Sequence, residues 1–190
     1  MGGGKKITKY ATIRSVLSIV WLLIVATGCV PRARIPDERF QRAEQLVYVG
    51  TELMRKGRLQ EAERVYELAA EVAPVASAID GKGCVALLEN RLDQAEGYFL
   101  EAYDMDGAYD DVLLNLGLLY QLKGQSDKAR AIYLDYLSKW PESPRARNDL
   151  AVLEYESGQG RIEVLSQLEK ARALSNHEII RANIDRLGLP

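Results

Sequence analysis

The sequence predicts an all-α protein, an α-solenoid of about three to four stacked helix pairs that ends in a capping helix. The main observation is an internal repeat, because Ala62, Ala95 and Ala129 recur at spacings of 33 and 34 residues with similar neighbours. A second observation is that the chain begins with a basic stretch followed by an apolar run, which ends shortly before Cys29. The repeats occupy the rest of the chain. One helix pair cannot bury its apolar face alone, so copies at this spacing are expected to stack into a continuous core.

Residues 1–28 are predicted to be an export signal. Lys5, Lys6, Lys9 and Arg14 make this segment positive, and no Asp or Glu occurs before residue 29. Residues 16–26 then form an apolar run of 11 residues, which suits a signal peptide and is too short to span a bilayer. We therefore expect this segment to be removed from the mature protein.

The apolar run ends in small residues directly before a cysteine, Ala26-Thr27-Gly28-Cys29. This pattern resembles the lipobox of bacterial lipoproteins. The resemblance implies that Cys29 receives a covalent lipid, such as palmitate, and becomes the first residue of the mature chain. A plain signal peptide or an uncleaved anchor, with Cys29 incidental, is the alternative interpretation.

The residues after Cys29 indicate which membrane holds the protein and how its body is attached. Lipoproteins that stay at the inner membrane carry Asp directly after the acylated cysteine, so Val30 favours the outer membrane, with the body facing the periplasm. In a single-membrane bacterium the same body would lie outside the cell. Residues 29–39 are expected to form the lipidated cysteine and a flexible tether, because residues 30–37 hold two prolines and two arginines and disfavour a helix.

Four repeat units are predicted within residues 40–190. The units at 43–75 and 110–143 each combine a glycine in the first helix with an alanine, an aromatic residue and a closing proline in the second helix. These residues are Gly50, Ala62, Tyr66 and Pro74 in one unit, and Gly117, Ala129, Tyr133 and Pro141 in the other. The unit at 76–109 keeps Gly83, Ala95 and Phe99. The unit at 144–174 begins with Leu150 and Ala151 and then departs from the pattern.

The ends of the predicted helices carry recognisable signals. Ser143 before Pro144 suits an N-cap followed by proline in the first turn. Ser175 and Glu178 have the spacing of a capping box, and an apolar stripe follows them. Residues 176–187 are therefore expected to form a helix that caps the stack.

This order of small, aromatic and turn residues resembles the tetratricopeptide repeat (TPR). The resemblance implies a right-handed superhelix with a concave surface lined by the first helix of each pair. The glycines and alanines are expected to let two helices approach closely, and the aromatic rings to fill the gap to the next pair.

The sequence offers no constellation of reactive groups, so no enzyme activity, cofactor or metal site is predicted. The one histidine, His177, has no second His or Cys at ligand spacing, and Cys84 is expected to behave as a small buried hydrophobe. The acidic run at residues 104–111 lacks the spacing of a calcium loop and suits a turn before a helix N-terminus.

The charge balance argues against nucleic acid as a partner. The chain has 25 basic and 27 acidic residues, and four of the basic residues precede Cys29, which leaves 21 basic residues in the body. This acidic body offers no continuous basic track for phosphates.

A protein or peptide is the expected partner, bound in the concave groove. Mapped through the resemblance, the groove residues are Val47, Thr51, Met54, Cys84, Leu87, Leu88, Leu114, Leu118, Gln121, Leu122, Val152 and Tyr155, with Asp80 and Asn148 at neighbouring positions. The middle of this surface is expected to be apolar and to suit an extended hydrophobic peptide or the apolar face of a helix. The alternative is that Leu114, Leu118 and Leu122 are covered by the protein's own helices.

These features together predict a membrane-anchored adaptor for protein–protein interactions in the bacterial envelope, which helps to assemble a pilus or a secretion machine. The alternative is a regulator or recruiting subunit for an outer-membrane assembly complex or a cell-wall hydrolase. The sequence leaves the partner and the oligomeric state open.

Overall fold

The computed structural model describes residues 37–187, and within this range every element is a helix and no strand occurs. The predicted signal segment, Cys29 and most of the predicted tether lie outside the described residues. No helix in the described range is long and apolar enough to cross a membrane.

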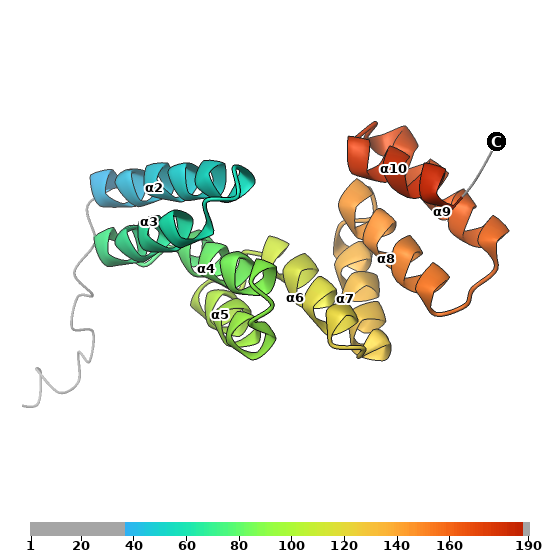
Figure 1. The fold of residues 1–190 in the computed structure, drawn as a ribbon, viewed down its shortest axis with the longest axis horizontal. Coiled ribbons are helices and arrows are strands. Elements are labelled where there is room, and N and C mark those ends of the chain that lie inside the picture. The colour runs from blue at the N-terminus through green and yellow to red at the C-terminus, as the bar shows by residue number, and fades with distance from the viewer. Residues whose placement is uncertain (1–36, 188–190) are drawn as a thin grey trace, which may run out of the picture. The chain divides into compact units, whose positions relative to one another are not determined.

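The described helices follow one another in pairs (Figure 1). They are α2 (Asp37–Arg55), α3 (Leu59–Val72), α4 (Ala76–Leu88), α5 (Leu92–Met105), α6 (Asp111–Leu122), α7 (Ser126–Lys139), α8 (Pro144–Glu156), α9 (Arg161–Leu174) and α10 (Glu178–Arg186). Each pair, from α2–α3 to α8–α9, packs against the next, and α10 packs on α9. This arrangement confirms the predicted solenoid of helix pairs.

A glycine in the first helix of a pair meets an aromatic ring from the second helix. A Cβ at Gly50 would lie 2.7 Å from the ring of Tyr66, and one at Gly117 would overlap the ring of Tyr133. The ring of Tyr66 also lies against Gly81 of the following pair. The rings therefore fill the space within a pair, and Tyr66 fills the expected gap to the next pair as well.

The two ends of the stack differ from its middle. In the later pairs the positions that face the preceding pair are buried and apolar, as at Val85, Leu119 and Leu153. Their counterpart in α2 is the polar Glu52, so the first helix presents a partly polar outer face. At the other end, Ile180 and Ile184 of α10 cover the last pair. Polar or covering ends of this kind keep a repeat stack soluble.

Two departures from the repeat have local explanations. Lys82 stands where a large apolar residue is usual, and its Nζ lies 4.6 Å from the centre of the Tyr98 ring, a favourable cation–π position. Tyr136 stands where a small residue is usual, and it is buried with its hydroxyl donating to Asp111 Oδ1 at 3.3 Å.

Some helix ends confirm the predictions and others correct them. Ser143 is the N-cap of α8, as predicted, and its side chain accepts from the N–H of Ala146. The predicted capping box was wrong, because Ser175 is the C-cap of α9 and the ring of His177 caps α10 by accepting from the N–H of Ile179. The predicted tether was too long, because α2 already begins at Asp37, whose charge favours a helix N-terminus.

The turn inside each pair contains one residue in the left-handed backbone conformation, at the same position of the repeat. Gly57, Asn90, Gly124 and Gly158 occupy equivalent positions with φ of 75°, 60°, 72° and 89°. Glycine adopts this conformation without steric cost, and asparagine tolerates it better than most residues. This conformation reverses the chain after only a short loop.

Two glycine substitutions test this interpretation of the turns. Gly97→Ala, within α5 and with open space around its Cβ, is expected to raise the free energy of unfolding by about 0.5–1 kcal/mol. Gly124→Ala also meets no atom, but its positive φ is expected to lower the free energy of unfolding by about 1 kcal/mol. Urea unfolding of the full-length protein, followed by circular dichroism, measures both, and equal effects would contradict this account.

Candidate functional site

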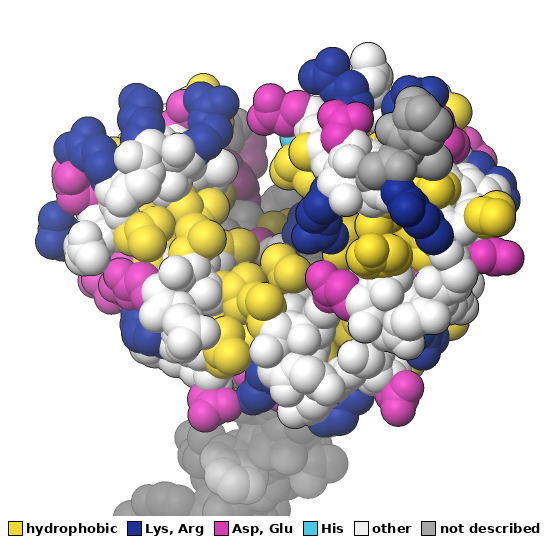
Figure 2. Space-filling view, turned by 45° about the vertical axis from the view of Figure 1, so that its right-hand side comes forward, with side chains coloured by type: hydrophobic (Ala, Val, Ile, Leu, Met, Phe, Trp, Pro, Cys, Tyr) yellow, Lys and Arg dark blue, Asp and Glu magenta, His cyan; other side chains and the backbone are white. Residues whose placement is uncertain are grey.

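The first helices of the pairs, α2, α4, α6 and α8, lie side by side along one face of the stack, which we call the concave face. The stack curves around this face (Figure 1), and the space-filling view shows a hollow in the surface (Figure 2). Figure 2 also shows hydrophobic side chains gathered beside this hollow. The concave face is therefore the candidate binding surface.

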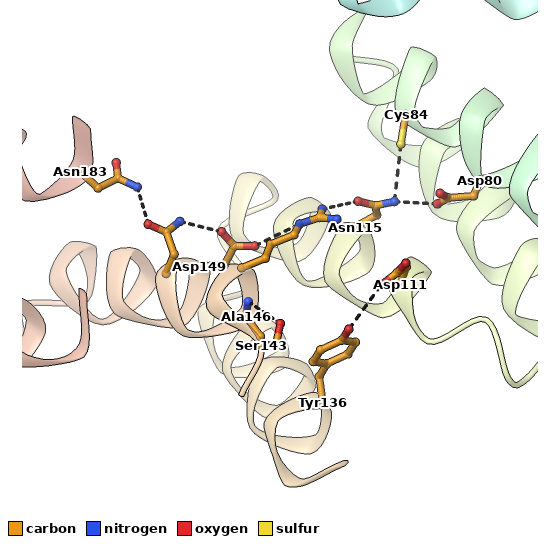
Figure 3. Close-up of polar contacts among 11 residues, drawn as sticks. Asp80, Cys84, Asp111, Asn115, Tyr136, Ser143, Ala146, Asp149 and Asn183 are labelled. Carbon is orange, nitrogen blue, oxygen red and sulfur yellow. Dashed lines mark hydrogen bonds and ion pairs between the residues drawn. The ribbon is translucent and has the colours of Figure 1, made fainter. Parts of the chain in front are cut away.

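A chain of polar contacts runs across the concave face from α4 to α6 and α8 (Figure 3). Tyr109 donates to Asp80 Oδ2 at 3.0 Å, and Asn115 Nδ2 donates to Asp80 Oδ1 at 2.7 Å. Arg145 then donates to Asn115 Oδ1 at 2.6 Å and lies 3.7 Å from Asp149. Side chains from three repeat units are thereby linked.

The same chain continues from α8 to α10. Asn148 Nδ2 donates to Asp149 Oδ1 at 3.0 Å, and Asn183 Nδ2 donates to Asn148 Oδ1 at 2.8 Å. The Asn183–Asn148 contact repeats the Asn115–Asp80 contact, since both join residues 35 apart. We call these residues, from Tyr109 and Asp80 to Asn183, the polar chain.

Burial sets the electrostatics of the polar chain. Desolvation raises the pKa of the Asp80 carboxyl, and the hydrogen bonds from Asn115 and Tyr109 act in the opposite direction. Desolvation also raises the pKa of Asp149, against its hydrogen bond from Asn148 and the charge of Arg145. Because the amide of Asn115 is already bonded on both sides, it positions its neighbours rather than offering a free ligand group.

An apolar row accompanies the polar chain at the other ends of the same helices. Leu88, Leu122 and Tyr155 lie near the C-terminal ends of α4, α6 and α8 and are 61%, 56% and 41% exposed. We call these three residues the apolar row. The half-buried residues beside it are Val47, Met54, Leu87, Leu118 and Val152.

The structure corrects part of the predicted groove. Leu114 is only 1% exposed and packs against Tyr133 and Leu153, so it belongs to the core and does not line the open face. The middle of the face is also more polar than expected, because Asp80 and Asn115 lie there. Asn115, missed from the sequence, could have been noticed from its 35-residue spacing to Asp80.

The remaining predicted groove residues are partly engaged within the protein. Thr51 is exposed, and its hydroxyl bonds to the carbonyl of Val47 and to the hydroxyl of Tyr66, both at 3.0 Å. Gln121 donates to Glu156 at 2.6 Å. Burial raises the pKa of the Cys84 thiol to about 12, which makes this cysteine a poor nucleophile.

Comparison with known proteins adds the family and the fold. The family model of the coatomer epsilon subunit matches residues 43–150, which is more than half of the 190 residues. The chain belongs to the coatomer epsilon subunit family. No curated protein matches the sequence.

Solved structures show the same fold. PilF of Pseudomonas aeruginosa has a TM-score of 0.68 and 19% identity, over 80% of this chain and 69% of that chain. MamA has a TM-score of 0.56 and 23% identity, over 70% and 78%. YrrB, a TPR protein with an unusual peptide-binding site, has a TM-score of 0.52 and 19% identity, over 75% and 74%. The fold is therefore a TPR-like helical repeat.

These matches are to helical-repeat scaffolds rather than to enzymes, in agreement with the sequence analysis. Within residues 37–187 no group of His, Cys, Asp and Glu side chains is placed to hold a metal ion.

Beneath the concave face, two equivalent tyrosines differ in how their hydroxyls are satisfied. The hydroxyl of Tyr66 bonds to Thr51, whereas that of Tyr133 is buried and has no hydrogen-bond partner in the described structure. The reason is that Leu118 takes the position of Thr51 in the third pair. A buried polar group without a partner destabilises the folded state.

This difference predicts opposite effects for the same substitution. Tyr133→Phe removes the unpartnered hydroxyl and is expected to raise the free energy of unfolding by about 1 kcal/mol. Tyr66→Phe removes a hydrogen bond and is expected to lower it by about 1 kcal/mol. Thermal unfolding measures both, and a loss of stability in Tyr133→Phe would show that its hydroxyl has a partner after all.

Proposed function

We propose that this chain is a membrane-anchored adaptor of the bacterial envelope that holds a protein partner on its concave face. The observation that carries the proposal is the apolar row, since Leu88 and Leu122 expose large side chains at equivalent positions of successive first helices, and Tyr155 does so one position earlier in α8. Exposed apolar groups in one row are typical of protein interfaces. The buried polar chain beside the row holds the helices that present it.

The membrane anchor in this proposal is inferred from the sequence. The positive start, the apolar run and the small residues before Cys29 support a lipid on that cysteine. Val30 supports the outer membrane, with the helical repeat facing the periplasm.

The role of the adaptor is proposed as assembly of a pilus or a secretion machine. The fold likeness to PilF, at 19% identity, supports this role. Membership in the family of the coatomer epsilon subunit, by its name a component of a larger assembly, also suits a scaffold that binds other proteins. A recruiting subunit for a cell-wall hydrolase or an outer-membrane assembly complex would use the same face.

In-cell photocrosslinking tests the concave face. With benzoylphenylalanine at Leu122 of the full-length protein, irradiation is expected to give a distinct adduct, identified by mass spectrometry. The same probe at Leu134, on the second helix α7 and 51% exposed, is the matched control and is expected to give little of that adduct. Leu88→Glu is expected to weaken the Leu122 adduct, because a charge interrupts the apolar row.

The protein identified in the adduct decides between the two proposed roles. A pilus or secretion component in the adduct supports the proposed machine, and a cell-wall hydrolase or an assembly factor supports the alternative. Equal adducts from Leu122 and Leu134, or none from Leu122, would contradict binding on the concave face.

Metabolic labelling tests the anchor. In cells fed an alkyne analogue of palmitate, the full-length protein is expected to carry the label and to sediment with membranes. Cys29→Ser is expected to lose both properties, whereas Cys84→Ser, the only other cysteine, keeps them. Label that persists in Cys29→Ser would refute lipidation at that residue.

A further inference from the structure

Carboxylates line one edge of the concave face, from α2 past the end of α5 to the start of α6. Glu44, Asp106 and Asp111 form no ion pair within residues 37–187, and the hydrogen bonds that they accept come from uncharged donors. Ser77 donates to Glu44 at 2.9 Å, and the N–H of Ala108 donates to Asp106 at 3.0 Å. We call these three carboxylates the acidic edge, and each has oxygen atoms left for a cation.

A pocket of about 410 Å³ opens at the acidic edge. Phe40, Met105 and Tyr109 give it apolar and aromatic walls, and Glu44 and Asp106 add carboxylates. No lysine or arginine lines it. Apolar walls suit the methylene stem of a basic side chain, and carboxylates with aromatic rings suit its cationic head.

The acidic edge and the apolar row reach opposite ends of α6. Asp111 at the edge and Leu122 in the row are 11 residues apart in α6, a separation of about 16 Å at about 1.5 Å per residue. A helix with its side chains is about 10–12 Å wide, so one helix laid across α4 and α6 reaches both with its long side chains. An extended strand is much narrower and reaches only one of them.

We propose that the partner presents a basic amphipathic helix to the concave face. Its apolar side lies on Leu88, Leu122 and Tyr155, and its lysines and arginines lie along the acidic edge, one of them in the pocket of Phe40 and Glu44. The proposal rests on the proposed function and adds the chemistry of the partner. Charge complementarity of this kind fixes the orientation of a bound helix and speeds its association.

Three peptides of equal length serve as probes. The first repeats Leu-Lys-Lys-Leu-Leu-Lys-Leu twice and forms a basic amphipathic helix, the second has Glu in place of Lys, and the third alternates Leu and Lys as a strand would. The full-length protein carries benzoylphenylalanine in place of Tyr155, so only peptide on the concave face is crosslinked. The yield is measured against peptide concentration.

The basic helix is expected to reach half-maximal yield at a concentration at least about tenfold lower than either other peptide. Glu44→Lys with Asp106→Lys is expected to raise that concentration at least about tenfold, and the milder Glu44→Gln with Asp106→Asn to raise it less. Glu67→Lys with Glu101→Lys, on the exposed sides of α3 and α5, changes the net charge equally and is expected to have little effect.

The inference is overturned if the acidic or the alternating peptide binds as well as the basic helix. It is also overturned if the α3 and α5 charge changes weaken binding as much as those at the acidic edge. The proposed function fails separately: an envelope partner crosslinked at Leu122 in cells, with no preference for the basic helix peptide, leaves the adaptor role in place and removes only this inference.

Discussion

The stack depends on how closely the two helices of each pair approach, and this distance is set by an aromatic ring that lies against a glycine. A side chain at the glycine would occupy the volume of the ring. The contact repeats through the first three pairs, as Gly50 with Tyr66, Gly83 with Phe99, and Gly117 with Tyr133. Because the same contact recurs in each of these pairs, successive first helices are placed in a similar way and form one face.

The fourth pair supports this interpretation from within the chain. Ala151 takes the position of the glycine, and Leu168, smaller than an aromatic residue, takes the position of the ring. Both are fully buried in one cluster. The methyl group added by Ala151 is compensated in volume by the smaller side chain of Leu168, as close packing requires.

The concave face combines a buried polar chain with an exposed apolar row, which occupy opposite halves of α4, α6 and α8. Buried polar side chains such as Asp80 and Asn115 occupy the earlier halves and tie neighbouring pairs together. Burying such groups is costly unless they are hydrogen-bonded, and the polar chain satisfies that requirement from α4 to α10. The later halves expose leucine and tyrosine, so the apolar row lies apart from the buried polar contacts that order the stack.

The sequence predicted the repeat and the pairs, because glycine, alanine and aromatic residues at a fixed period act through local packing. It did not predict that Leu114 is buried or that Arg145 reaches Asn115, because these contacts depend on how neighbouring pairs are rotated in the stack. His177 was missed as a helix cap for a similar reason, since its role depends on where α9 ends.

A double-mutant cycle of Gly117→Ala and Tyr133→Leu, which gives the third pair the residues of the fourth, tests the ring–glycine contact most directly. Urea unfolding of the full-length protein is expected to show that Gly117→Ala lowers the free energy of unfolding by about 1–3 kcal/mol. Tyr133→Leu is expected to lower it by leaving a cavity. The double variant is expected to lose less than the sum by about 1 kcal/mol or more. Losses that add to within about 0.5 kcal/mol would mean that ring and glycine act independently, and would contradict the account.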